Sequence, residues 1–148
     1  MPRVKRSAAI DAPHESVWAV VSEPRRLPHW WPEVERVEEA TPEAWTTVHV
    51  TRRGRTLRAD WTRTEAEPPT TLAWRQEIEA SPFERFLSRA ETRIELAPLD
   101  AGERTGVQIR STTRLRGLAH LGAPMFRRAT RRRLDRALAG LSDVVGAR

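Results

Sequence analysis

The sequence predicts a single α+β domain, in which an antiparallel sheet packs against one long helix. The chain has 148 residues, the usual size of one domain. Between residues 34 and 115, apolar and polar residues alternate with a period of two in segments separated by turn residues, which is typical of consecutive antiparallel strands. Residues 125–145 instead show helical spacing, and only this segment is long enough to cover one face of such a sheet.

The first elements are a strand and two short helices. Residues 3–11 alternate weakly and are expected to form a strand. Asp11 can accept hydrogen bonds from the free N–H groups of a helix over 13–22, and Pro13 needs no donor in its first turn. A second short helix is expected over 25–31. The six further strands are expected at residues 34–39, 44–52, 56–65, 71–79, 89–97 and 106–115.

The last helix is expected at about 125–145, with Pro124 near its start and Gly146 just past its end. One face of this helix is apolar and the opposite face is basic. The apolar face comprises Phe126, Leu134, Ala137, Leu138, Leu141, Val144 and Val145. The basic face comprises Arg127, Arg128, Arg131, Arg132 and Arg136. Residues 117–148 hold seven Arg and two Asp, so five of the six net positive charges of the protein lie there.

Composition excludes several classes of protein. The chain has no Cys, which rules out disulfide scaffolds and thiolate metal sites. The four His form no close ligand pair, and no nucleotide-binding or hydrolase motif occurs, so we expect neither a metal nor a cofactor. No apolar run approaches the ~20 residues of a membrane span, and no signal-peptide core follows the basic N-terminus. We therefore expect a cytoplasmic protein with no integral membrane segment.

Two segments resemble a known superfamily. Residues 10–18 (IDAPHESVW) and 22–34 (SEPRRLPHWWPEV) are similar to the opening of START-like, or polyketide cyclase/dehydrase-like, domains (SRPBCC, the helix-grip fold). The resemblance covers nearly the whole chain. It implies seven strands in a curved antiparallel sheet around a long C-terminal helix, two short helices after the first strand, and a deep cavity between sheet and helix. Members bind lipids, polyketide intermediates, quinones or other hydrophobic molecules, and a minority are enzymes without universal catalytic residues.

Strand alternation selects candidate cavity residues. In the fourth strand one face is uniformly polar, so Trp61 and Arg63 are expected to face inward. The same reasoning applies to the fifth and seventh strands. Trp61 and Trp74 suit core packing as well as a cavity wall. Largely apolar walls with a few polar groups are typical of small-molecule pockets. The candidate ligand-binding residues are Trp31, Trp61, Arg63, Trp74, Gln76, Ser111, Thr113 and Phe126.

Arg63 and His49 are the candidate catalytic residues. A buried unpaired charge is strongly disfavoured, so Arg63 must reach the cavity rim, pair with a carboxylate or bind an anionic ligand group. His49 lies on a strand of ambiguous orientation. If Val48 and Val50 form its core face, which we favour slightly, His49 is exposed. If His49 faces inward, it is the best general acid or base in the chain.

Two further segments leave alternatives open. Residues 81–87 carry three large apolar side chains in a connection, and form either a lid over the cavity or, as we favour, a short strand or turn on the sheet edge. The basic face of the last helix, together with Arg133, suits RNA or an anionic membrane, but a solvated outer face is the simpler interpretation. No DNA partner is expected, and exposed sheet edges permit a homodimer.

Three functions follow from these observations. The first is binding of a small hydrophobic or aromatic ligand, lipid-like, polyketide-like or quinone-like, in the cavity. The second is an enzyme of the polyketide cyclase, aromatase or dehydrase type. The third is an RNA- or membrane-associated partner domain that uses the Arg-rich helix.

Overall fold

Seven antiparallel strands form one sheet in the order β1-β7-β6-β5-β4-β3-β2, in a computed structural model described over residues 3–146. Successive strands from β2 to β7 are neighbours, and β1 pairs with β7 at the far edge. Short turns join most of these strands, as the sequence predicts. The strands are β1 (Arg3–Ile10), β2 (Arg36–Glu38), β3 (Ala44–Val50), β4 (Thr56–Glu67), β5 (Thr71–Glu77), β6 (Leu87–Leu99) and β7 (Arg104–Leu115).

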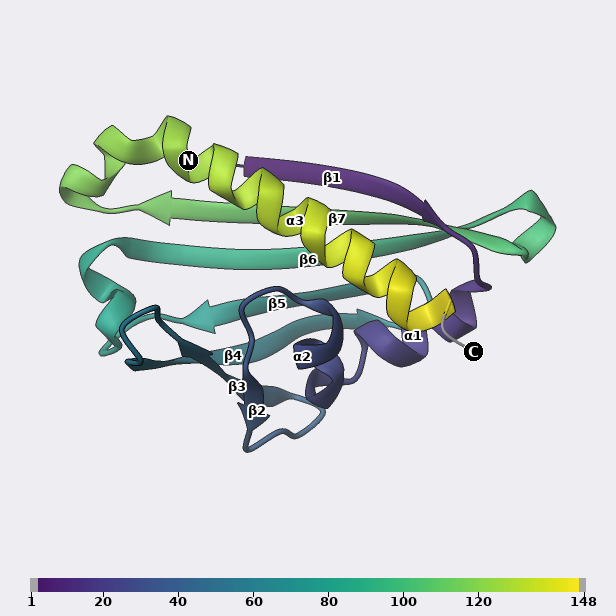
Figure 1. Ribbon diagram of the computed structural model, residues 1–148, viewed down its shortest axis with the longest axis horizontal. Helices are drawn as coiled ribbons and strands as arrows, with labels where there is room; N and C mark the ends of the chain where they lie inside the picture. Colours follow the sequence, from purple (N-terminus) through teal and green to yellow (C-terminus); the bar gives the residue numbers. More distant parts are fainter. Residues whose placement is uncertain (1–2, 147–148) are drawn as a thin grey trace.

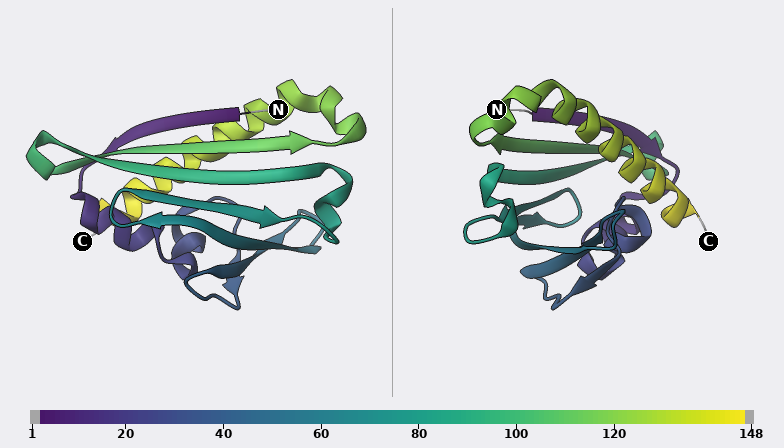
Figure 2. Two further views of the ribbon diagram at one scale, coloured as in Figure 1. Left: turned by 180° about the vertical axis from the view of Figure 1, so that it is seen from behind. Right: turned by 60° about the vertical axis from the view of Figure 1, so that its left-hand side comes forward.

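Within residues 3–146, the α-helices all lie on one face of the sheet. The long helix α3 (Ala123–Gly146) runs obliquely across that face, and α1 (His14–Val21) and α2 (Leu27–Trp30) lie beside its C-terminal half (Figure 1). The sheet curves around α3 (Figure 2). Short 3-10 helices occupy connections: η1 (Pro24–Arg26), η2 (Pro82–Arg85), η3 (Asp100–Gly102) and η4 (Gly117–Gly122). The predicted α+β helix-grip architecture is therefore confirmed, including the two short helical segments after the first strand.

Two local predictions are wrong. The N-cap of α1 is Pro13 and no side chain caps this helix, so Asp11, two residues earlier, does not fill the capping role expected for it. The strand expected over 34–39 is shortened to Arg36–Glu38. Val34 leaves the strand because it packs into the core, and Glu39 takes a left-handed conformation with φ of 50°.

The core lies between the concave face of the sheet and the three α-helices. Ile94 and Ile109 of the sheet and Leu134 and Leu141 of α3 are essentially inaccessible to solvent. Burying a side chain of this size contributes about 1.5–3 kcal/mol relative to exposure. The same apolar alternation that predicts the strands thus fixes which sheet face receives α3.

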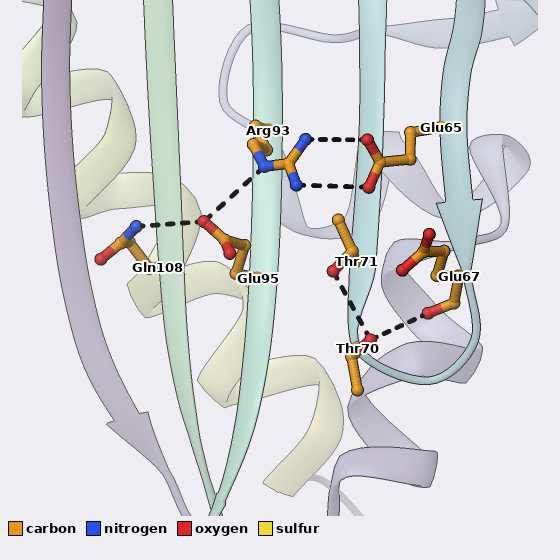
Figure 3. A network of polar contacts seen from close by, with 7 residues as sticks. All are labelled: Glu65, Glu67, Thr70, Thr71, Arg93, Glu95 and Gln108. Carbon is orange, nitrogen blue, oxygen red and sulfur yellow. Dashed lines mark hydrogen bonds and ion pairs between the residues drawn. The ribbon is translucent and has the colours of Figure 1, made fainter.

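The convex face of the sheet is polar, as Figure 3 shows for part of it. Glu65, Ala73 and Arg93 are opposite one another on β4, β5 and β6. The small Ala73 side chain lets the Arg93 guanidinium reach across β5 to both Glu65 carboxylate oxygens, at 3.0 and 3.2 Å. Arg93 also lies 3.7 Å from Glu95, which accepts a hydrogen bond from Gln108. These ion pairs and hydrogen bonds give the charged side chains on this face partners of opposite charge or hydrogen-bond partners.

Strand β3 buries side chains on both faces. Trp45 and Thr47 face the core and are each 3% exposed, whereas Val48 is fully buried on the opposite face. Val48 lies between Arg36 and Arg58 in the strand register, and both guanidinium groups bind Glu38 at 3.0 Å. Their aliphatic stems cover the valine. The interpretation we favoured, that the Val48 and Val50 face is the core face, is therefore wrong.

Candidate functional site

A cavity of about 760 Å³ lies between the concave face of the sheet and α3. Strands β3 to β7, α3 and the segment after α2 all contribute to its lining, and η2 and η4 lie at its mouth. Its walls are mainly apolar, and five aromatic side chains line it: Trp31, Trp61, Phe83, Phe86 and Phe126. Both its volume and its composition fall in the range of small-molecule sites, which is about 300–1,000 Å³.

Six of the eight candidate ligand-binding residues line this cavity. The sheet supplies four of them and the elements around α3 and α2 supply the other two. They are Trp31, Trp61, Gln76, Ser111, Thr113 and Phe126. Trp74 and Arg63 are not part of the lining.

Trp74 belongs to a cluster of tryptophans at one end of the cavity. Trp31 lines the cavity and makes edge contacts with Trp30 and Trp74, at ring-centre distances of 5.3 and 6.1 Å. Trp74 in turn contacts Trp45 at 5.7 Å. Trp30, Trp45 and Trp74 are each at most 4% exposed. Trp31 is the member of this cluster that lines the cavity, and Trp74 packs against it.

Arg63 lies beyond this cluster. Its Nη2 donates a hydrogen bond of 2.8 Å to the carbonyl of Ser22, and its guanidinium carbon lies 5.4 Å from the centre of the Trp45 ring. Burial lowers the pKa of the guanidinium, and the charges of Glu23 and Glu43 oppose that shift. Arg63 therefore lies outside the lining of this cavity and donates to a backbone carbonyl, whereas the sequence left open the cavity rim, a carboxylate partner or an anionic ligand group. The strand places it near the end of α1, where it joins β4 to the helical segment.

His49 lines the cavity as part of a chain of hydrogen bonds. The Trp61 indole N–H can only donate, and it donates to Thr47 Oγ1 at 2.9 Å. His49 Nδ1 lies 2.8 Å from the Glu33 carbonyl, which can only accept, so the proton of the neutral ring is on Nδ1. The Thr47 hydroxyl then donates to His49 Nε2, also at 2.8 Å. Both ring nitrogens are thus engaged within the protein.

The surroundings of His49 favour its neutral form. Burial lowers the pKa of the imidazole, and the charge of Arg133 lowers it further. The hydrogen bond to the Glu33 carbonyl and the Glu33 charge act in the opposite direction, but less strongly overall. His49 therefore supplies the cavity with a neutral, hydrogen-bonded ring.

Two buried polar atoms of the lining and the half-buried Arg133 lack a hydrogen-bond partner among residues 3–146. The Gln76 amide nitrogen and the Thr130 hydroxyl are buried without a hydrogen bond. Arg133 is half-buried and makes no ion pair or hydrogen bond with the described residues. Thr130 was not among the candidate residues, and Arg133 was expected on the outer basic face. The available signal was spacing, because Thr130 follows Phe126 by four residues and Arg133 follows Thr130 by three.

The cavity mouth has apolar side chains exposed to solvent. Residues 81–87 form a turn, the 3-10 helix η2, followed by the start of β6. The expected sheet-edge position is wrong, because β5 and β6 are interior strands. Phe83 and Phe86 from this segment line the cavity, and Phe86 is 57% exposed. Further along the mouth, Leu118 and Leu121 of η4 are more than four-fifths exposed.

The basic face of α3 is exposed, as expected for Arg127, Arg128, Arg131, Arg132 and Arg136. Arg136 lies 3.8 Å from Glu33 in an exposed ion pair. No helix within the described residues has the length and apolar character needed to cross a membrane. Nor do residues 3–146 bring together three or more His, Asp or Glu side chains that could hold a metal ion.

Known structures of the same fold cover nearly the whole chain. A START superfamily protein from Mycobacterium smegmatis matches with a TM-score of 0.78 at 14% identity, over 98% of this chain and 97% of the other. TTHA0849 from Thermus thermophilus matches with a TM-score of 0.78 at 22% identity, over 99% and 98% of the two chains. BexL, a di-domain ARO/CYC protein from the BE-7585A biosynthetic pathway, matches at 21% identity over 96% of this chain and 45% of BexL, with a TM-score of 0.75.

A search of curated proteins gave no match. The family model described as polyketide cyclase / dehydrase and lipid transport matches residues 1–146. Together with the curved sheet, the long C-terminal helix and the cavity between them, this match establishes that the chain belongs to the polyketide cyclase/dehydrase and lipid transport family.

Proposed function

We propose that the protein binds a hydrophobic or aromatic small molecule in the cavity between the sheet and α3. The observation that carries this proposal is a cavity of about 760 Å³ lined by five aromatic side chains together with buried polar atoms that lack partners. Apolar walls supply affinity, while sparse polar groups orient a ligand. Membership of a family described for cyclisation, dehydration and lipid transport supports the same class of ligand.

Binding is favoured over catalysis by the placement of the two candidate catalytic residues. Both nitrogens of His49 are occupied, by Glu33 and Thr47. Arg63 binds the Ser22 carbonyl and lies outside the cavity lining. A histidine that acts as a general base needs a free ring nitrogen within hydrogen-bond reach of the proton that it removes. The family description makes polyketide-like molecules one natural group of ligands for the cavity.

The experiment uses anthracene-2-carboxamide, a flat neutral probe that absorbs where tryptophan emits. Binding to the full chain is measured as energy transfer from its tryptophans, two of which, Trp31 and Trp61, line the cavity. Ala90→Phe places a phenyl ring in the cavity lining on β6. Ala66→Phe makes the same change at an exposed position of β4 outside the cavity and serves as the matched control.

We expect saturable binding to the unmodified chain, at least a tenfold loss of affinity in Ala90→Phe, and a change below twofold in Ala66→Phe. Circular dichroism spectra verify that both variants are folded. Equal affinity of the two variants, or no binding to the unmodified chain, would contradict the proposal. Native mass spectrometry of the purified chain then identifies any co-purified molecule.

A further inference from the structure

We infer that the ligand is an amphipathic organic acid whose carboxylate pairs with Arg133, and this inference rests on the proposed function. Arg133 lines the cavity from α3 and is half-buried. It has no ion pair or hydrogen bond within the described part of the chain, unlike Arg136 on the next turn, which lies 3.8 Å from Glu33. A guanidinium group that is partly withdrawn from water is stabilised by an anionic oxygen partner.

The carboxylates of the cavity lining are already paired elsewhere. Glu91 accepts two hydrogen bonds from Arg89, at 2.9 and 3.0 Å. Glu33 pairs with Arg136. His49 adds no positive charge, because its burial and Arg133 both lower its pKa. The cavity therefore presents a cation that the described residues leave without an anion, and Arg52 adds a second cation at the mouth.

Two buried donors point to oxygen atoms on the same ligand. Thr130 lies one turn before Arg133 on the cavity side of α3 and is 2% exposed, yet its hydroxyl has no partner. A threonine within a helix can donate to the carbonyl four residues earlier, and Thr130 does not. On the opposite wall, the Gln76 amide nitrogen is equally unpartnered in a residue that is 9% exposed.

These three groups define the ligand chemistry. Unpaired buried donors are rare in folded proteins, because each one forgoes its hydrogen bond with water. A carboxylate held by Arg133 can also accept from Thr130, and a carbonyl or hydroxyl oxygen further along the ligand can accept from Gln76. The aromatic walls take the apolar remainder. A phosphate monoester carries up to two charges and suits this single interior guanidinium less well.

The test compares two probes of the same shape, anthracene-2-carboxylic acid and anthracene-2-carboxamide, at pH 7.5. Arg133→Gln removes the charge inside the cavity. Arg132→Gln removes the same charge from the neighbouring exposed residue of α3, which does not line the cavity. Thr130→Val removes the hydroxyl group while keeping the side-chain shape. Dodecanoate and dodecyl phosphate, two competitors of equal chain length, distinguish a carboxylate site from a phosphate site.

We expect the unmodified chain to bind the carboxylate about tenfold more tightly than the carboxamide. Arg133→Gln abolishes this preference, and its circular dichroism spectrum, unchanged from that of the unmodified chain, shows that the variant is folded. Arg132→Gln leaves the preference within twofold, and Thr130→Val weakens carboxylate binding about fivefold.

Equal binding of the two probes by the unmodified chain would overturn the inference and leave the proposed function standing. An equal loss of preference in Arg132→Gln would overturn it as well, because the cause would then be the general charge of the helix. Stronger competition by dodecyl phosphate than by dodecanoate would overturn the choice of a carboxylate. Binding of neither probe would contradict the proposed function itself.

Discussion

At Gly140 on α3, one added carbon atom would disturb the packing of α3 against α2. A Cβ atom at this residue would lie 2.5 Å from the carbonyl oxygen of Trp30 and 3.1 Å from its Cα. Both atoms belong to the backbone of α2, so no side chain can rotate away. Since Trp31 follows directly and lines the cavity, the closeness of α2 to α3 also positions a wall of the site.

Two opposing effects decide the outcome of Gly140→Ala. Alanine is a better helix former than glycine by about 1 kcal/mol. Against this, the new contact is about 0.9 Å short of the 3.4 Å at which ordinary contacts begin. Overpacking of this kind destabilises a core by about 1–3 kcal/mol, and a clash with backbone belongs at the upper end. We expect a net loss of about 2 kcal/mol, which lowers the Tm by about 4–8 °C.

The assay is urea unfolding at 25 °C, followed by tryptophan fluorescence and far-ultraviolet circular dichroism. Gly146→Ala is the matched control, because it lies on the same helix and its added Cβ would meet no atom within 4 Å. We expect this control to be at least as stable as the unmodified chain. A Gly140→Ala variant of equal or greater stability would refute the close approach of α2 and α3.

Three further predictions concern single polar groups. Thr105→Val removes a fully buried hydrogen bond of 2.7 Å to the Ala12 carbonyl and should destabilise by about 1–3 kcal/mol in urea unfolding, whereas the exposed Thr64→Val should not. Folding lowers the pKa of His49, so its contribution to stability is complete above its unfolded pKa of about 6.5 and is lost as pH falls through the folded pKa. The free energy of unfolding, measured by urea unfolding from pH 8 to 5, should therefore fall with pH, and His49→Gln should reduce this fall. Arg63→Met should lower stability by about 1–2 kcal/mol but leave carboxamide affinity within twofold, and a tenfold loss of affinity would place Arg63 in the site.

The fold could be predicted because the pattern of apolar residues agrees with it at nearly every element. Alternation in β4 and β5 placed Trp61 and Gln76 on the concave face, where the structure has them. Alternation failed in β3, because burial of Val48 depends on Arg36 and Arg58 from neighbouring strands. A pattern within one strand does not contain that information.

The cavity was harder to predict than the sheet. Arg63 lies on the inward face of β4, as expected. Its position along the strand, however, places its guanidinium group against the Trp45 ring and the Ser22 carbonyl, away from the cavity. Arg133 was missed because a run of arginines suggests one uniform basic surface, whereas the helical turn directs this residue to the cavity. Which residues of an inward face reach a cavity depends on the tertiary packing of side chains from other elements.

The binding of a ligand between the sheet and α3 is tested most directly by the indole N–H signals of the six tryptophans in a proton–nitrogen NMR titration with anthracene-2-carboxamide. We expect the largest shifts for Trp31 and Trp61, which line the cavity, and no shift for Trp18 on α1, which does not. A titration in which the Trp18 signal moves while those of Trp31 and Trp61 stay fixed would contradict this site.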